Sequence, residues 1–167
     1  MPHYVQKSKS MDRIDYDVYV EGGYREDEAF GVTAYVIVDG VTGEEFTSGN
    51  LVCHDSTSMR IFIEGAIEAL KKIPFGASVR FITDTTYVVN IVNHKWRIKA
   101  NGDLWEKFER VARIGSHRCC AEWRGIRTND PILRRCWITC GKIAGFDFVK
   151  DFVRIYNEKH PSSRDEG

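Results

Sequence analysis

Three stretches early in the chain alternate apolar and polar residues in the manner of β-strands. In the first, Tyr16, Val18 and Val20 share one face, and we expect the two glycines at positions 22 and 23 to end the strand. Short turns such as Asp39-Gly40 separate the second and third stretches, which predicts an antiparallel meander. The three predicted strands are residues 15–21, 30–38 and 44–51.

After the meander, helical spacing alternates with short β-rich runs. Ile63, Ile67 and Leu70 recur at helical intervals, and serine and threonine residues just before them are typical N-caps. The predicted elements are helices over residues 61–73, 87–92, 104–114 and 132–144, and strands over 79–84 and 118–123. This order predicts an α/β fold with a five-stranded mixed sheet, in which parallel strands joined by crossover helices extend the meander.

The length of 167 residues is that of one ordinary domain. We expect residues 1–13 to be a flexible arm, residues 14–157 to form the domain with an extension over 146–157, and residues 158–167 to be a disordered tail. No apolar run is long enough for a membrane span, and the N-terminus lacks the pattern of a signal peptide. The expected protein is soluble and intracellular, in the cytoplasm, an organelle or the nucleus.

The formal net charge is zero, but the charges are unevenly distributed. Residues 91–145 contain twelve Lys or Arg residues and five Asp or Glu residues. This excess predicts either a basic face able to attract nucleic acid or an ordinary solvated surface. The five cysteines include no CxxC pair, which favours small buried side chains in a reducing compartment over a zinc site.

Asp84 is the first candidate for chemistry because it ends the predicted strand over 79–84, and open α/β sheets place their sites at the carboxyl ends of strands. Around it, the chain resembles the type 1 ribonuclease H family over roughly residues 16–144. Five landmarks carry the resemblance in the family's order: Val20-Glu21-Gly22-Gly23 for the family's Thr-Asp-Gly-Ser, the helix entry over Ser56–Arg60, Ile82-Thr83-Asp84-Thr85-Thr86-Tyr87-Val88 for its Ser-Thr-Asp-Ser-x-Tyr-Val, Asn101-Gly102-Asp103-Leu104-Trp105 for its Asn-x-Asp-Leu-Trp, and Glu122-Trp123-Arg124-Gly125 followed by Pro131 and Cys136.

The resemblance implies a ribonuclease H-like fold and an activity to compare with the residues present. Family members cut the RNA strand of RNA/DNA hybrids with two metal ions, Mg²⁺ or Mn²⁺, roughly 4 Å apart across the scissile phosphate. Such hard cations take oxygen ligands, and about four convergent carboxylates offset their charge. The family supplies them from the first strand, the first helix, the fourth strand and the last helix.

The resemblance transfers this carboxylate set only in part. Asp84 matches, and Glu21 keeps the charge on a longer side chain. The other two positions are Phe62 and Trp137, aromatic residues that would fill the volume of the metal ions. We therefore expect weak or absent metal binding by Glu21 and Asp84, and no efficient catalysis.

Four other acidic residues are possible substitutes for the missing carboxylates. Asp17 shares a strand face with Glu21 and is the best spare ligand, whereas Glu64 is rotated about 200° from Phe62 around the helix. Asp130 precedes a proline and is typical of a turn, although a loop at that place could bring it to the site. Asp103 is typical of a helix N-terminus.

Two segments are candidates for binding nucleic acid. Residues 94–99 interleave Trp96 with basic side chains and resemble the family's basic handle, which predicts base or sugar stacking and phosphate contacts, with a tryptophan capping the core edge as the alternative. The helix entry predicts contacts to a phosphate or 2′-hydroxyl, with capping as the plain alternative. The candidate binding residues are Thr57, Ser58, Arg60, Lys95, Trp96, Arg97 and Lys99.

The sequence therefore favours a degenerate ribonuclease H-like domain that binds an RNA/DNA hybrid or structured RNA without efficient cleavage. One alternative is an active metal-dependent nuclease that uses Glu21, Asp84 and an atypical third acid. The other is a protein-interaction subunit that docks through an apolar patch near Phe62 and Trp137 and through residues 146–156.

Overall fold

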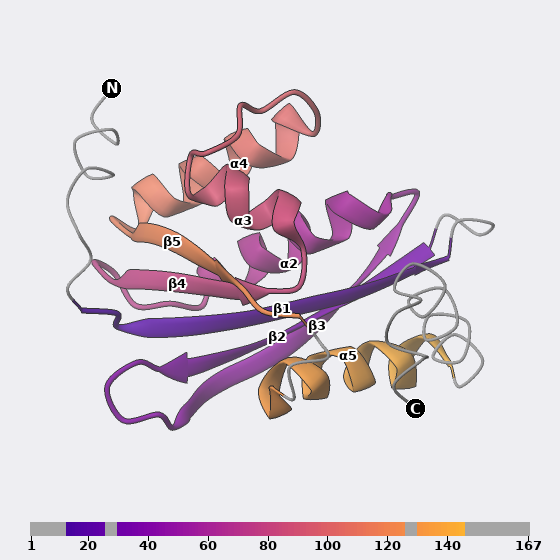
Figure 1. Cartoon of the computed structure of the whole chain (residues 1–167), viewed down its shortest axis with the longest axis horizontal. Coiled ribbons are helices and arrows are strands. Elements are labelled where there is room, and N and C mark those ends of the chain that lie inside the picture. The colour runs from indigo at the N-terminus through magenta and orange to yellow at the C-terminus, as the bar shows by residue number, and fades with distance from the viewer. Residues whose placement is uncertain (1–12, 26–29, 126–129, 146–167) are drawn as a thin grey trace.

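The computed structural model describes residues 13–25, 30–125 and 130–145 (Figure 1). Five strands form one mixed sheet in the order β3-β2-β1-β4-β5. β1 pairs antiparallel with β2 and parallel with β4, so the sheet changes from antiparallel to parallel at β1. The predicted fold class is confirmed. The strands are β1 (Tyr16–Arg25), β2 (Phe30–Asp39), β3 (Glu45–His54), β4 (Ser78–Thr83) and β5 (Arg118–Trp123).

The helices lie in two layers around the sheet (Figure 1). Three of them cover one face, and α5 packs on the other face over β1 and β2. Because side chains alternate along a strand, β1 supplies both cores: Val18 and Val20 face α2, whereas Tyr19 faces α5. The helices are α2 (Ser58–Leu70), α3 (Thr86–Val92), α4 (Gly102–Ile114) and α5 (Pro131–Ala144).

The predicted end of the first strand is wrong. β1 runs through both glycines to Arg25, with Gly22 opposite Thr33. A side chain at position 22 would lie 2.9 Å from the Cδ1 atom of Ile61. The absence of a side chain at Gly22 therefore lets α2 pack closely on a strand that continues beneath it.

Some sequence expectations fall outside the described residues. These are the arm before Arg13, the extension over 146–157 and the tail over 158–167. Three of the five cysteines, Cys53, Cys136 and Cys140, are buried, and none of the five forms a disulfide. Among the described residues, no helix has both the length and the apolar content that crossing a membrane requires.

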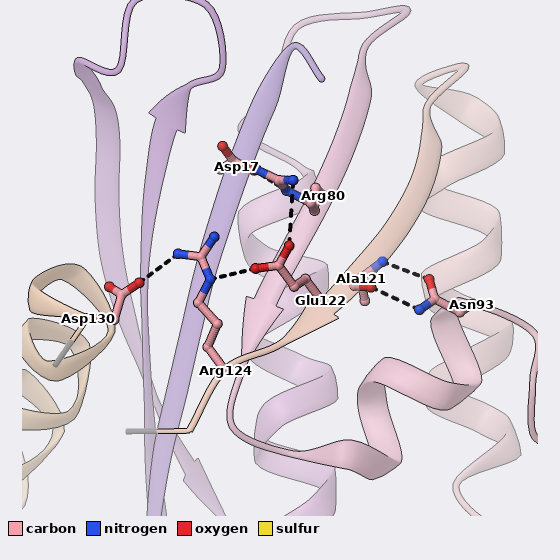
Figure 2. Close-up of polar contacts among 7 residues, drawn as sticks. All are labelled: Asp17, Arg80, Asn93, Ala121, Glu122, Arg124 and Asp130. Carbon is pink, nitrogen blue, oxygen red and sulfur yellow. Dashed lines mark hydrogen bonds and ion pairs between the residues drawn. The ribbon is translucent and has the colours of Figure 1, made fainter. Parts of the chain in front are cut away.

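The outer edge of β5 is paired by a side chain. The Asn93 amide, just after α3, donates to the Ala121 carbonyl oxygen at 2.9 Å and accepts from the Ala121 N–H at 2.8 Å (Figure 2). Its two bonds have the donor and acceptor pattern of a neighbouring strand. Asn93 thereby ties the end of α3 to the sheet.

The contact between α2 and β2 generates a test of the packing. A Cβ atom at Gly65 would lie 2.2 Å from Thr33 Oγ1, and also within 3.2 Å of Thr33 Cγ2 and Cβ, so no rotation of Thr33 makes room. We expect Gly65→Ala to lower the free energy of unfolding by about 1–3 kcal/mol, measured by urea denaturation. Gly102→Ala is the control because nothing lies within 4 Å of its added Cβ. Equal stability of the two variants would contradict this packing.

Candidate functional site

Glu21, within β1, and Asp84, directly after the end of β4, occupy neighbouring positions at the carboxyl end of β4. The parallel register pairs Val20 with Thr83, so each of the two acids is the residue that follows this last pair. Glu21 is only 2% exposed, and its Oε2 atom is buried without a hydrogen-bond partner. The site predicted from Asp84 therefore contains Glu21, but in a buried position.

The electrostatic surroundings of Glu21 favour its protonated form. Burial, followed by repulsion from the Asp84 carboxylate, raises the pKa of Glu21 well above its ordinary value. The backbone N–H groups of Gly22 and Asp84 act in the opposite direction but are weaker. A neutral carboxylic acid is a poor ligand for a divalent cation, so this group differs in its chemistry from an exposed catalytic carboxylate.

Two aromatic residues occupy the other expected carboxylate positions. Phe62 lies on α2, is half-buried and packs against the core between α2 and the sheet. Trp137 lies on α5 directly after the buried Cys136 and is also half-buried. Neither belongs to the most exposed apolar side chains of the described residues. An apolar docking patch at this place remains a prediction.

Three of the proposed substitute acids are held in ion pairs. The Asp17 carboxylate accepts from Arg80 Nε at 2.8 Å. Asp103 forms a two-bond pair with Arg60, at 2.9 and 2.7 Å, which joins the starts of α2 and α4. The third, Asp130, pairs with Arg124 at 2.7 Å (Figure 2).

Asp130 also caps the last helix. Its Oδ1 atom accepts from the N–H groups of Ile132 and Leu133, while Oδ2 holds Arg124. The sequence predicts a turn at Asp130, and in the structure this residue is the N-cap that precedes α5. A move towards Asp84 would leave the first N–H groups of α5 unsatisfied and break an ion pair.

Arg124 belongs to a chain of charges across the open face of β1, β4 and β5. Glu122 lies between Arg124 and Arg80, and Arg80 reaches Asp17 (Figure 2). The Arg124 guanidinium also stands 6.0 Å from the centre of the Tyr19 ring. The three carboxylates of this charge chain, those of Asp17, Glu122 and Asp130, outnumber its two arginines, Arg80 and Arg124.

The residues present do not fit a pair of Mg²⁺ or Mn²⁺ ions. Within the described ranges, no group of three or more His, Cys, Asp or Glu side chains is placed to hold a metal ion. Glu21 and Asp84 supply two carboxyl groups, and burial favours a proton on one of them. Two-metal chemistry needs more negative oxygen ligands than this pair offers.

The basic segment after α3 is exposed and anchored at both ends. Its side chains Lys95, Arg97 and Lys99 are exposed, and Trp96 is 51% exposed. At the start, the N–H groups of Lys95 and Trp96 donate to the Asn90 carbonyl oxygen. Within the part of the chain that the structure describes, no acidic side chain forms an ion pair with these three cations.

Tyr87 anchors the other end of the basic segment. Its hydroxyl donates to the Ala100 carbonyl oxygen at 3.3 Å and accepts from Trp105 Nε1 at 2.9 Å. Asn101 Nδ2 reaches the same hydroxyl at 3.3 Å. These bonds attach residues 95–99 to α3 and α4, so the exposed side chains are carried by a supported segment.

The helix entry shows the alternative that sequence left open. Thr57 caps α2 by accepting from the Arg60 N–H at 3.3 Å, and Ser58 is the exposed first residue of the helix. Arg60 is held by Asp103, a pairing that sequence reasoning missed because 43 residues separate the two. Phosphate contacts by Thr57, Ser58 and Arg60 remain predictions.

Trp123 is a site residue that sequence reasoning did not single out. Its Nε1–H donates to the Asp84 carbonyl oxygen at 3.1 Å, which places the indole beside the acidic pair. The signal available in the sequence was its position, immediately after Glu122 at the end of the predicted strand over 118–123. That position corresponds to the same sheet edge as Asp84.

Replacing Glu21 by glutamine tests its protonation. Because the folded-state pKa is raised, the stability that the bound proton supplies is complete below the unfolded-state pKa and is lost as pH rises towards the folded-state pKa. Relative to Glu21→Gln, wild-type unfolding free energy is expected to fall with pH by about 1.4 kcal/mol per unit in that window.

Urea denaturation of both proteins at a series of pH values from acid to neutral measures this difference. The ionisable groups that interact with Glu21 are Asp84 and the thiols of Cys136 and Cys140. The pKa values of the two thiols are raised, first by burial and then by the charge of Glu21. A stability difference that does not change with pH would show that folding does not raise the pKa of Glu21.

Comparison of the sequence with known proteins finds relatives but no matching family model. The chain is 26% identical over 142 residues to a ribonuclease H of Syntrophus aciditrophicus, covering 77% of this chain and 79% of that protein. It is also 26% identical over 132 residues to a ribonuclease H of Hahella chejuensis, covering 71% and 86% of the two chains.

Comparison of structures finds the same fold. The N-terminal RNase H domain of a Mycobacterium tuberculosis protein superposes with a TM-score of 0.63 at 15% identity, covering 79% of this chain and 99% of that one. RNase H1 of Halobacterium salinarum gives 0.58 at 17% identity, with 72% and 92% covered. The chain is therefore similar in sequence to proteins named ribonuclease H, and its fold is ribonuclease H-like.

Proposed function

We propose that this ribonuclease H-like domain binds nucleic acid, an RNA/DNA hybrid or structured RNA, without cleaving it efficiently. The observation that carries the proposal is the buried Glu21 carboxyl beside Asp84, with a raised pKa. Relatives named ribonuclease H supply the ligand class, since the substrate of that activity is an RNA/DNA hybrid.

The loss of catalysis follows from charge and geometry. Two divalent ions carry four positive charges, and Glu21 with Asp84 offsets at most two of them. The longer side chain of Glu21 also shifts its carboxyl group, and displacements on the scale of 1 Å cost about a hundredfold in rate. The substitutes Asp17, Asp103 and Asp130 are each engaged by an arginine.

Binding does not require the missing carboxylates, because phosphate contacts and stacking hold nucleic acids independently of metal ions. Four arginines near the sheet, Arg60, Arg80, Arg124 and Arg135, pair with carboxylates. Lys95, Arg97 and Lys99 have no such pairing with any described residue, and Trp96 stands among them. This supported segment is therefore our binding surface.

The first test is a cleavage assay. The wild-type protein is incubated with an end-labelled RNA/DNA hybrid and Mn²⁺ or Mg²⁺, and products are resolved on a denaturing gel. We expect no more product than the matched variant Asp84→Asn forms, because the pair cannot hold two ions. Turnover that Asp84→Asn abolishes would establish the alternative, an active nuclease with atypical ligands.

The second test measures binding by fluorescence anisotropy of a labelled hybrid. The double variant Lys95→Ala with Trp96→Ala is expected to lower affinity roughly tenfold or more, since stacking contributes about 1–3 kcal/mol per base. Losing one phosphate contact also reduces the slope of log affinity against log salt by about 0.9. Lys72→Ala, an exposed lysine after α2, is the control. An unchanged affinity and salt slope in the double variant would refute this surface.

A further inference from the structure

Trp123 ends β5 at the same edge of the sheet as the acidic pair. Thr83 of β4 pairs with Trp123, and the Arg124 N–H donates to the Thr83 carbonyl oxygen at 3.0 Å. At the carboxyl ends of β4 and β5, Asp84 and Trp123 therefore occupy positions neighbouring Glu21 of β1. A ligand that crosses this edge meets the indole next to Asp84.

The indole is held in a defined orientation. On one side its Nε1–H bonds the Asp84 carbonyl oxygen. Beside the ring lies the buried Gly125, where an added Cβ would stand 3.1 Å from Cη2 of the ring and 3.8 Å from Asp84 Oδ1. Glycine at position 125 thus lets the backbone lie close to both the ring and the Asp84 carboxyl group.

Despite these contacts, Trp123 is 48% exposed. A large aromatic surface in water carries a hydrophobic cost that a stacked ligand would relieve. The neighbouring charges do not compete for that ligand, because Arg124 points across the sheet to Glu122 and Asp130 (Figure 2). The end of β5 therefore presents the exposed ring of Trp123, whose N–H is already hydrogen-bonded.

We propose that Trp123 is a stacking platform for an unpaired nucleobase. The inference rests on the proposed nucleic-acid binding and adds a subsite to it. Bases inside a duplex are covered on both sides by their neighbours, whereas an unpaired base in a single-stranded overhang exposes a face that can lie on the indole. Because the N–H is engaged by Asp84, recognition uses the ring surface alone and tolerates any base.

The test compares two ligands, a blunt RNA/DNA hybrid and the same hybrid with a short single-stranded overhang. For the wild-type protein we expect the overhang to raise affinity about tenfold, the scale of one stacked base. Trp123→Leu is expected to bring the ratio of the two affinities close to one, whereas Trp123→Phe keeps part of the gain. The control is Phe75→Leu, which changes a 79% exposed aromatic preceding β4, and it should keep the full ratio.

A crosslinking experiment tests the same contact without substitution. A 5-iodouracil base is placed in the overhang, the wild-type complex is irradiated, and the crosslinked peptide is identified by mass spectrometry. We expect the crosslink on Trp123. A crosslink confined to other residues, or an overhang gain that survives in Trp123→Leu, overturns the stacking platform.

The outcomes separate the two proposals. If the wild-type protein binds the blunt hybrid through Lys95 and Trp96 but gains nothing from the overhang, the Trp123 inference fails and the proposed function stands. If neither hybrid binds, the proposed function fails and the Trp123 inference fails with it. If the overhang gain depends on Trp123, both are supported.

Discussion

A carboxyl group buried at the junction of two parallel strands constrains this edge of the molecule. The β1–β4 register places Glu21 beside Asp84, and the burial of Glu21 makes a second negative charge there costly. The surrounding backbone is held closely: the Thr33 hydroxyl and the Cys140 thiol both donate to the Glu21 carbonyl oxygen. These bonds hold β1 between its two helical layers. The burial of the Glu21 side chain leaves little room for the water that a hydrated cation would carry.

Local neutralisation decides which charges are left for a ligand. The excess of basic residues over 91–145 suggests a broad basic face, but Arg135 is paired with Glu45 of β3, and Arg124 with Glu122 and Asp130. Charge that is uneven along the chain therefore becomes more even in space. The segment over 95–99 differs because its cations are exposed and form no ion pair with an acidic side chain of the described residues.

The sequence predicted the order and type of the elements because alternation, helical spacing and ordered landmarks all agreed. It failed for β1 beyond Glu21, since the local preference of glycine to break strands is outweighed by the close approach of Ile61, which no local pattern contains. Among the site residues, Asp84 and the two aromatic replacements, Phe62 and Trp137, could be identified from their positions in the sequence. The bond between Arg60 and Asp103 and the exposure of Trp123 depend on tertiary contacts between distant residues.

The Asn93 side chain has a consequence for how the sheet meets other chains. An edge strand with unsatisfied N–H and C=O groups is a template on which further strands can assemble. By bonding both the N–H and the C=O group of Ala121, Asn93 removes one pairing position for a further strand at the edge of β5. Among the described strands, β3 is left as the edge at which the sheet is open to extension. The two edges of the sheet therefore differ in how they can pair with another chain. Asn93 occupies part of the β5 edge, beside the candidate site, and β3 forms the edge on the far side of the sheet.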